Sequence, residues 1–351
     1  MNLQPRRVAI IKPSALGDIA HALPVLSGLR RLYPDAHISW VVNKGFAGLL
    51  QHHPQLNATL EFDRRAYKNP VTAVIYTLQL QQQLRRQRFD LVLDLQGLLR
   101  TGLMTAATGA PVRLGFATAR EGSRHFYSHR LKVPDADRIH AVDRYWRMIE
   151  FLGGGHLQKE FRVPVDGDAL NRMLAVLLTL PQPWSAVAPG ARWLTKRWPV
   201  EKFAELLNQT QAKFGGTTVL LGAPDDIALS ADLTKLSKHP CLDLTGKTSI
   251  AEMVAVLSRS AVMISNDTGP LHVAVALGVP CVAAYLCTKV NLHGPYMGAS
   301  PKSAGVPTMV PCAGSYVRKC PHGLRCFADV AVGMLAKEVS RILTAWIPAD
   351  R

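Results

Sequence analysis

The stretch that decides the fold covers residues 261–283 and reads Ala-Val-Met-Ile-Ser-Asn-Asp-Thr-Gly-Pro-Leu-His-Val-Ala-Val-Ala-Leu-Gly-Val-Pro-Cys-Val-Ala. Val262 to Ser265 is a short apolar run rich in β-branched residues, which predicts a buried strand. Leu271 to Leu277 predicts a short helix closed by Gly278, and the run from Cys281 to Tyr285 predicts the next strand.

The turn between this strand and its helix has the composition of an anion site. Asn266, Asp267 and Thr268 are helix-capping types, and Gly269-Pro270 suits a tight turn into a first helical turn. In a parallel sheet this edge is where ligands bind, and a helix N-terminus there can hold a phosphate. The backbone at Thr268 and Gly269 allows an anion to approach closely, and His272, one turn further on, can reach the same anion. The alternative is an ordinary capped helix without a ligand.

The N-terminal end of the chain repeats this arrangement. Val8 to Ile11 predicts a buried strand, Lys12 to Asp18 a glycine-bearing loop, and Ile19 to Leu32 a helix. The loop lacks the three spaced glycines of a dinucleotide-binding fingerprint. It brings the Asp18 carboxylate to the edge of the sheet, although Asp18 as a helix cap is the alternative.

The remaining chain alternates between predicted strands and helices in two halves. We expect an N-terminal domain over residues 1–165, a linker over 166–183 and a second domain over 184–328. A last helix, within 329–351, is expected to pack back across the domains. Further predicted strands are 38–42, 89–95, 186–188 and 217–221, and further helices are 71–88, 140–152, 200–213, 251–258 and 330–346.

Charge and hydropathy limit the partners. The net charge is +16 over 351 residues, a field that recruits polyanions such as anionic membrane or phosphorylated substrates. Nucleic acid is not expected, because no zinc-finger, RNP or bZIP pattern is present. No apolar run reaches the length of a membrane span, which predicts a cytoplasmic protein with at most peripheral membrane contact.

The most basic long segment is 113–147. Within it, Gly115 to Arg130 has little periodicity and is expected to form a long loop over the first domain's ligand edge. Six cysteines are present. Cys312, Cys320 and Cys326 match no standard zinc spacing, so reduced structural thiols are expected and a metal or redox role is the alternative.

Three segments together resemble glycosyltransferase family 9, the bacterial lipopolysaccharide heptosyltransferases. They are Lys12-Pro-Ser-Ala-Leu-Gly-Asp18, then Pro189-Gly190 with Lys196-Arg-Trp-Pro199, and finally Asn266-Asp-Thr-Gly-Pro-Leu-His272, with a weaker likeness in Cys320-Pro to Cys326. The resemblance implies an α/β fold of GT-B type, with two Rossmann-like parallel-sheet domains facing each other across a cleft. It also implies an inverting transfer from ADP-heptose to an anionic, Kdo-bearing lipid A acceptor at the inner membrane, with no metal or other cofactor.

The resemblance also implies the site residues. Asp18 would be the general base, and Lys196 would stabilise the departing diphosphate. For the acceptor we expect Ser14, Gly17, Arg120 and Arg124. The expected donor-binding residues are Pro189, Gly190, Thr195, Lys196, Asp267, Thr268, Gly269, Pro270, Leu271 and His272.

The chain departs from the family at one turn. Leu286-Cys-Thr-Lys289 stands where the family usually has a Gly-Pro-Thr type turn, which bears on the donor-sugar contacts. The alternatives are a transferase of the same fold with another nucleotide sugar or acceptor, a sugar-nucleotide epimerase, and a non-catalytic polyanion-binding protein.

Overall fold

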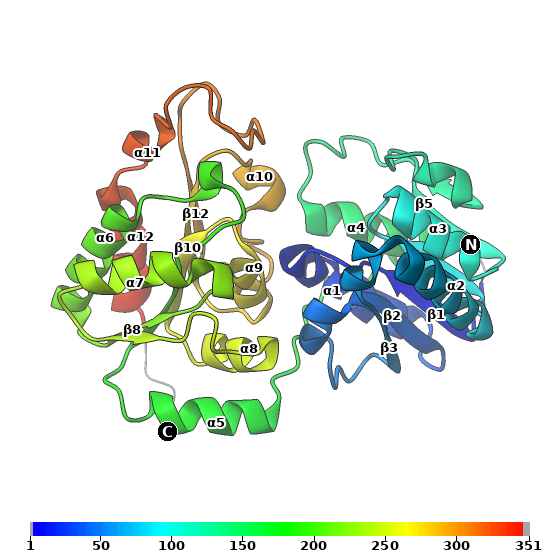
Figure 1. Ribbon diagram of the computed structural model, residues 1–351, viewed down its shortest axis with the longest axis horizontal. Helices are drawn as coiled ribbons and strands as arrows, with labels where there is room; N and C mark the ends of the chain where they lie inside the picture. Colours follow the sequence, from blue (N-terminus) through cyan, green and yellow to red (C-terminus); the bar gives the residue numbers. More distant parts are fainter. Residues whose placement is uncertain (1–2, 347–351) are drawn as a thin grey trace. The chain divides into compact units, whose positions relative to one another are not determined.

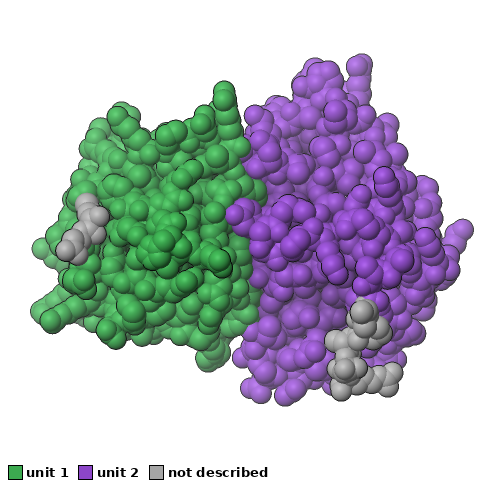
Figure 2. Space-filling view, turned by 180° about the vertical axis from the view of Figure 1, so that it is seen from behind, with its two compact units in different colours: residues 1–164 green, residues 165–351 purple. Residues whose placement is uncertain are grey.

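The computed structural model describes residues 3–346. The chain divides into two compact units, Met1–Pro164 and Val165–Arg351 (Figure 2). Each unit is built on a parallel sheet with helices on both sides (Figure 1). No helix in the described range is long and apolar enough to cross a membrane.

The first unit contains a six-stranded sheet with strand order β3-β2-β1-β4-β5-β6. Its strands are β1 (Arg7–Ile11), β2 (His37–Asn43), β3 (Ala58–Phe62), β4 (Leu91–Asp94), β5 (Val112–Phe116) and β6 (His129–Leu131). Its helices are α1 (Leu16–Leu32), α2 (Pro70–Arg86), α3 (Leu99–Ala107) and α4 (Ala141–Ile149), with short turns η1 (Lys44–Leu49), η2 (Arg64–Lys68), η3 (Ser123–Phe126) and η4 (Glu150–Gly154).

The second unit repeats this topology with the order β12-β11-β10-β7-β8-β9. Its strands are β7 (Trp184–Ala188), β8 (Thr217–Leu220), β9 (Cys241–Asp243), β10 (Val262–Asn266), β11 (Cys281–Tyr285) and β12 (Ala304–Pro307). Its helices are α5 (Gly167–Leu177), α6 (Val200–Phe214), α7 (Ile227–Leu236), α8 (Ile250–Ser258), α9 (Gly269–Ala276), α10 (Val290–His293), α11 (Cys326–Asp329) and α12 (Val332–Thr344), with short turns η5 (Leu194–Lys196) and η6 (Pro224–Asp226).

The central strands read as unbroken apolar runs because helices cover both faces of each sheet. Every residue of β10 and of β11 is buried. Separate hydrophobic cores form in the two units, one around Ile11, Val41 and Phe62, the other around Trp198, Phe203 and Ile264. Each unit therefore buries its own apolar surface.

The strand order places a ligand edge in each unit. The chain starts at a central strand, fills one side of the sheet, and returns to fill the other side. The order reverses between β1 and β4 in the first unit and between β7 and β10 in the second. In open α/β sheets, ligands bind at the carboxyl ends of the strands at this reversal.

Two connections contain more regular structure than the sequence predicted. Of Gly115 to Arg130, the first two residues belong to β5 and the last two to β6, where Gly115 pairs with Arg130, and the loop between them covers residues 117–128 and includes η3. Residues 166–183 are not a plain linker, because Asp166 caps α5, accepting from Ala169 N at 2.8 Å, and α5 packs against α8. These elements are short or flanked by glycine and proline, which hides their periodicity.

The last helix belongs to the second unit. α12 packs against α6 and strands β10 to β12, and so completes the core of that unit. Its buried face contains Leu335, Val339 and Ile342, which have helical spacing and match the apolar surface of that sheet.

Candidate active site

A cluster of three charged or ionisable side chains lies at the carboxyl ends of β7 and β10. Lys196 Nζ is 2.5 Å from Asp267 Oδ2, and His272 Nε2 is 3.1 Å from Asp267 Oδ1. Lys196 comes from η5 after β7, Asp267 follows β10, and His272 lies in the first turn of α9. Their side chains are 18%, 6% and 6% exposed, respectively. The sequence predicted all three as donor-binding residues, and the fold brings them together.

Charge pairing keeps Asp267 ionised despite its burial. Burial by itself would raise the pKa of this carboxyl, but the hydrogen bond from His272 and the ammonium of Lys196 hold the pKa below its usual range. The carboxylate in turn fixes the Lys196 ammonium at the start of α9. A positive charge that is already in position can stabilise a diphosphate without reorganising.

The N-terminus of α9 supplies backbone donors beside this cluster. Thr268 is the N-cap residue, in extended conformation, and its side chain makes no capping hydrogen bond. The first N–H groups of a helix have no intrahelical acceptor, and Gly269 lets a ligand approach them closely. Pro270 has no N–H, and the side chain of Leu271 is fully buried, so Leu271 can offer a ligand only its backbone.

Asn266 connects the two loops of this site, although the sequence suggested it only as a capping type. Its side chain donates to Pro189 O at 2.7 Å and accepts from Trp198 N at 2.9 Å. Gly190 lies so close to Asp226 that an added Cβ would be 2.3 Å from the carboxyl carbon. These contacts fix the path of the loop after β7, and the close approach of Asp226 leaves no room for a side chain at position 190.

Thr195 is turned toward the altered turn after β11. Its hydroxyl donates to Val317 O at 2.7 Å and accepts from the Cys287 thiol at 3.5 Å. Tyr316 N donates to Cys287 O, and Arg318 lies 4.9 Å from the centre of the Trp193 ring. Cys287 and the segment 316–318 therefore build the wall beside Lys196 in this chain.

In the first unit, Asp18 lies in the first turn of α1 rather than in the preceding loop. Its Oδ2 accepts from Ala15 N at 3.1 Å, which is a capping contact. Its Oδ1 accepts from Tyr145 OH at 3.3 Å and lies 3.8 Å from Lys12 Nζ. One oxygen therefore caps the helix while the other faces a buried ammonium. The side chain is still 37% exposed, and a positioned, accessible carboxylate can accept a proton.

Lys12 is a candidate site residue that the sequence analysis did not single out. It is almost fully buried directly after β1. Burial opposes its charge, but Asp18 and Tyr145 outweigh this and raise the pKa of Lys12 above its ordinary value. A lysine that ends an otherwise apolar strand was the available signal, since buried charges need a partner.

The residues expected at the acceptor are partly brought together. Ser14 and Gly17 both precede Asp18 in the chain, and Ser14 is half-buried while Gly17 is buried. Arg120 and Arg124 are exposed, and Arg120 N donates to Gly97 O at 2.9 Å. That bond attaches the arginine segment to the loop after β4, at the carboxyl edge of the same sheet.

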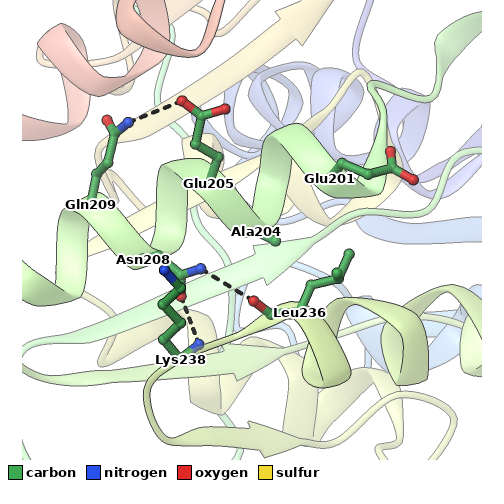
Figure 3. Close-up of a pocket in the computed structure, with 7 residues that line it drawn as sticks. All are labelled: Glu201, Ala204, Glu205, Asn208, Gln209, Leu236 and Lys238. Atoms are coloured by element: carbon green, nitrogen blue, oxygen red, sulfur yellow. Dashed lines mark hydrogen bonds between the residues drawn. The ribbon is translucent and has the colours of Figure 1, made fainter.

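A hollow of about 370 Å³ lies between α6 and the segment after α7 (Figure 3). Its lining amides are already bonded, with Asn208 joined to Leu236 O and to Lys238 N. All six cysteines are free thiols, and no cluster of three or more His, Cys, Asp or Glu side chains suits a metal within residues 3–346.

Comparison with known proteins gives consistent matches over most of the chain. The chain is 28% identical to lipopolysaccharide heptosyltransferase 1 of Pseudomonas aeruginosa over 335 residues, and the match covers 90% of this chain and 88% of the relative. A family 9 glycosyltransferase from Veillonella parvula matches in structure with a TM-score of 0.84 and 21% identity, covering 99% of both chains. The E. coli heptosyltransferase WaaC with ADP matches with a TM-score of 0.75 and 22% identity, covering 96% of this chain and 99% of WaaC.

These structural matches confirm the predicted fold, an α/β protein of GT-B type with two Rossmann-like sheets. The model of glycosyltransferase family 9 (heptosyltransferase) matches residues 77–320, and this chain belongs to that family of glycosyltransferases.

Proposed function

We propose that this enzyme transfers a heptosyl group from ADP-heptose to an anionic acceptor of the lipopolysaccharide inner core, with inversion at the anomeric carbon. The observation that carries the proposal is the Lys196–Asp267 ion pair at the N-terminus of α9. It provides a fixed cation and unpaired helix donors at the place where a nucleotide diphosphate binds in such sheets. The named relatives, which are lipopolysaccharide heptosyltransferases, support the donor and the acceptor class.

In the proposed reaction the acceptor hydroxyl attacks the anomeric carbon directly. A new C–O bond forms as the bond to the diphosphate breaks, and ADP leaves with its added charge on the diphosphate oxygens. Asp18 accepts the hydroxyl proton, with Lys12 and Tyr145 holding its second oxygen. Lys196 and the N–H groups at Thr268 and Gly269 stabilise the leaving group, so no metal ion or other cofactor is required.

The proposed acceptor is an anionic glycolipid at the cytoplasmic face of the inner membrane. The net charge of +16 favours this partner electrostatically. Arg120 and Arg124 are exposed at the edge of the sheet that carries Asp18, and we assign them to the acceptor's phosphate or carboxylate groups.

Isothermal titration with ADP tests the donor site. We expect binding that is the same with Mg²⁺ and with a chelator, and that weakens by about tenfold or more in Lys196→Ala, because a charge-assisted contact is lost. Lys235→Ala is the matched control, because Lys235 is an exposed lysine that is not part of the proposed donor site. Binding of a UDP sugar or GDP sugar without binding of ADP or ADP-heptose would overturn the donor assignment.

Asp18→Asn separates transfer from binding. This change keeps the size of the side chain but removes its basicity, so we expect turnover to fall by about 10²-fold or more while ADP affinity stays unchanged. Product analysis by NMR would report the anomeric configuration. Retained configuration, or full activity of the variant, would contradict the proposed mechanism.

A further inference from the structure

Helix α2 has an apolar stripe that faces solvent. Val71, Val74, Ile75 and Leu78 are each more than half exposed. Their spacing of i, i+3, i+4 and i+7 places them on one face of the helix. The opposite face already contacts the core through Leu80 and Leu84. The exposed stripe is therefore a second apolar face, which the fold of this unit leaves uncovered.

The stripe continues onto the neighbouring helix. α2 packs against α3 (Figure 1). α3 exposes Leu99 and Leu103 one turn apart. Leu78 and Leu103 line the same shallow hollow of about 500 Å³, together with Ala106, Ala107, Gln81, Gln82 and Arg85. Apolar side chains that gather in this way on a soluble surface mark a binding site more often than isolated ones do.

The charge at the two ends of the stripe is mostly positive, although Arg65 is paired with Asp63 at 3.3 Å. Residues 64–88 include six basic residues and no Asp or Glu. Arg64, Arg65 and Lys68 precede the helix in η2, and Arg85, Arg86 and Arg88 come at its end and just after. Arg85 is seven residues after Leu78 and so lies on the stripe's own face. Arg100 of α3 adds another cation, with its guanidinium 5.8 Å from the centre of the Tyr67 ring.

The helix itself is well fixed at its start. Asn69 caps it, its side chain accepting from Val71 N at 2.9 Å, and Pro70 occupies the first turn. A capped helix with apolar side chains on its outer face and cations at both ends fits an anionic bilayer surface. The apolar side chains enter the region between headgroups and acyl chains, and the cations remain at the phosphates.

We propose that the α2 stripe, formed by Val71, Val74, Ile75 and Leu78 with its flanking arginines and lysine, docks the enzyme on an anionic lipid bilayer. The inference goes beyond the proposed reaction, because it concerns bulk lipid rather than the acceptor. It rests on the proposed function in one respect, because docking on a membrane brings the enzyme to its acceptor only if that acceptor is lipid-linked. Sedimentation with vesicles that contain no acceptor tests it separately from sugar transfer.

The full-length protein is sedimented with vesicles of phosphatidylglycerol and phosphatidylethanolamine, and with vesicles of phosphatidylcholine alone. We expect binding to the anionic vesicles that weakens at high salt, because screening reduces the attraction of the cations. Ile75→Gln with Leu78→Gln should weaken partitioning by about tenfold or more, since two exposed apolar side chains no longer enter the bilayer. Arg85→Gln with Arg86→Gln should also weaken it about tenfold.

Matched controls come from the second unit. Leu178→Gln with Ile227→Gln removes a leucine and an isoleucine of similar exposure, and Lys235→Gln with Lys238→Gln removes two exposed lysines. Both controls should bind vesicles as the wild type does. Thermal melting and ADP titration of every variant verify folding and the donor site, so loss of ADP binding would count against the proposed function and not against docking.

Three results would overturn the docking proposal. The first is that the wild type does not bind anionic vesicles. The second is that the Ile75/Leu78 variant binds them as tightly as its control, which would leave only an electrostatic polyanion site. The third is that the protein forms a dimer that this variant abolishes, which would assign the stripe to a second copy of the chain.

Discussion

Lys196 and Asp267 are 71 positions apart, yet their side chains make the shortest ion pair of the site, at 2.5 Å. The pairing depends on two loops that leave adjacent strands. The Asn266 side chain joins them, because it hydrogen-bonds to Pro189 O and Trp198 N of the loop after β7. Because both partners are largely buried, removing one leaves the other uncompensated. The pair is therefore expected to matter for stability as well as for the diphosphate.

The stability effect of Asp267 should depend on pH. Its pKa in the folded protein lies below the ordinary value of 3.8, so its contribution is full above about pH 4 and is lost as the pH falls through the folded-state pKa. Asp267→Asn should lose about 3 kcal/mol of unfolding free energy at neutral pH. Urea denaturation at several pH values measures this. A difference from wild type that does not narrow in acid would contradict the assignment.

Lys12 should act on turnover through Asp18. Lys12→Met keeps a long unbranched side chain but removes the ammonium 3.8 Å from the Asp18 carboxylate. We expect turnover to fall by about 10–100-fold, because a general base that is displaced slightly loses much of its effect. ADP affinity should not change, since Lys12 belongs to the first unit. A variant that folds and retains full turnover would exclude this positioning role.

At the scale of elements, strand β5 shows how the edge of the first sheet is kept in place. Gly115 lies under Tyr127, whose ring an added Cβ would approach to 2.2 Å. The Tyr127 hydroxyl donates to Asp94 Oδ2 at 2.8 Å, and Asp94 Oδ1 accepts from Gly97 N at 3.0 Å. Burial raises the pKa of Asp94, although these hydrogen bonds favour its charged form. The loop after β4 is thus connected to the segment that follows β5.

Gly115→Ala should therefore destabilise the first unit by about 1–3 kcal/mol or more, because the added methyl group displaces the Tyr127 ring. Gly155→Ala is the matched control, since nothing lies within 4 Å of an added Cβ there. Thermal melting compares the two variants. Equal melting temperatures would show that the Tyr127 ring can move without cost.

At the scale of the whole molecule, each unit has its own sheet and its own core. Lys196, Asp267 and α9 all belong to the second unit, whereas Asp18, Lys12 and the α2 stripe belong to the first. The chain therefore separates the groups proposed for leaving-group stabilisation from those proposed for proton removal and membrane docking.

A fragment covering residues 165–351 should fold and bind ADP with the affinity of the full chain. Its core is self-contained, and α12 closes it by packing on α6. Calorimetric unfolding and ADP titration of the fragment test this, and the fragment carrying Lys196→Ala is the control. A folded fragment that does not bind ADP would show that the first unit contributes directly to the donor site.

Much of the fold follows from local sequence. The apolar runs at 8–11, 262–265 and 281–285 form strands because only a covered parallel sheet buries such segments on both faces. Asp18, Asp267 and His272 could be selected from the sequence because each lies in a turn or first helical turn directly after a predicted strand. Lys196 was selected only through the resemblance to family 9. A short strand such as β6 could not be predicted, since three residues are too few for a periodic pattern.

The sequence by itself determined two alternating α/β halves, the loops that lie at their ligand edges, and the chemical types that could act there. Only the tertiary structure decided the partners. It pairs Lys12 with Asp18 and joins Asn266 by hydrogen bonds to Pro189 and Trp198. It also bonds the Thr195 hydroxyl to Val317 O and leaves the α2 stripe exposed. The reason is physical: strand and helix propensities depend on neighbouring residues, whereas a buried charge or an uncovered face is defined by which distant segments the strand order brings into contact.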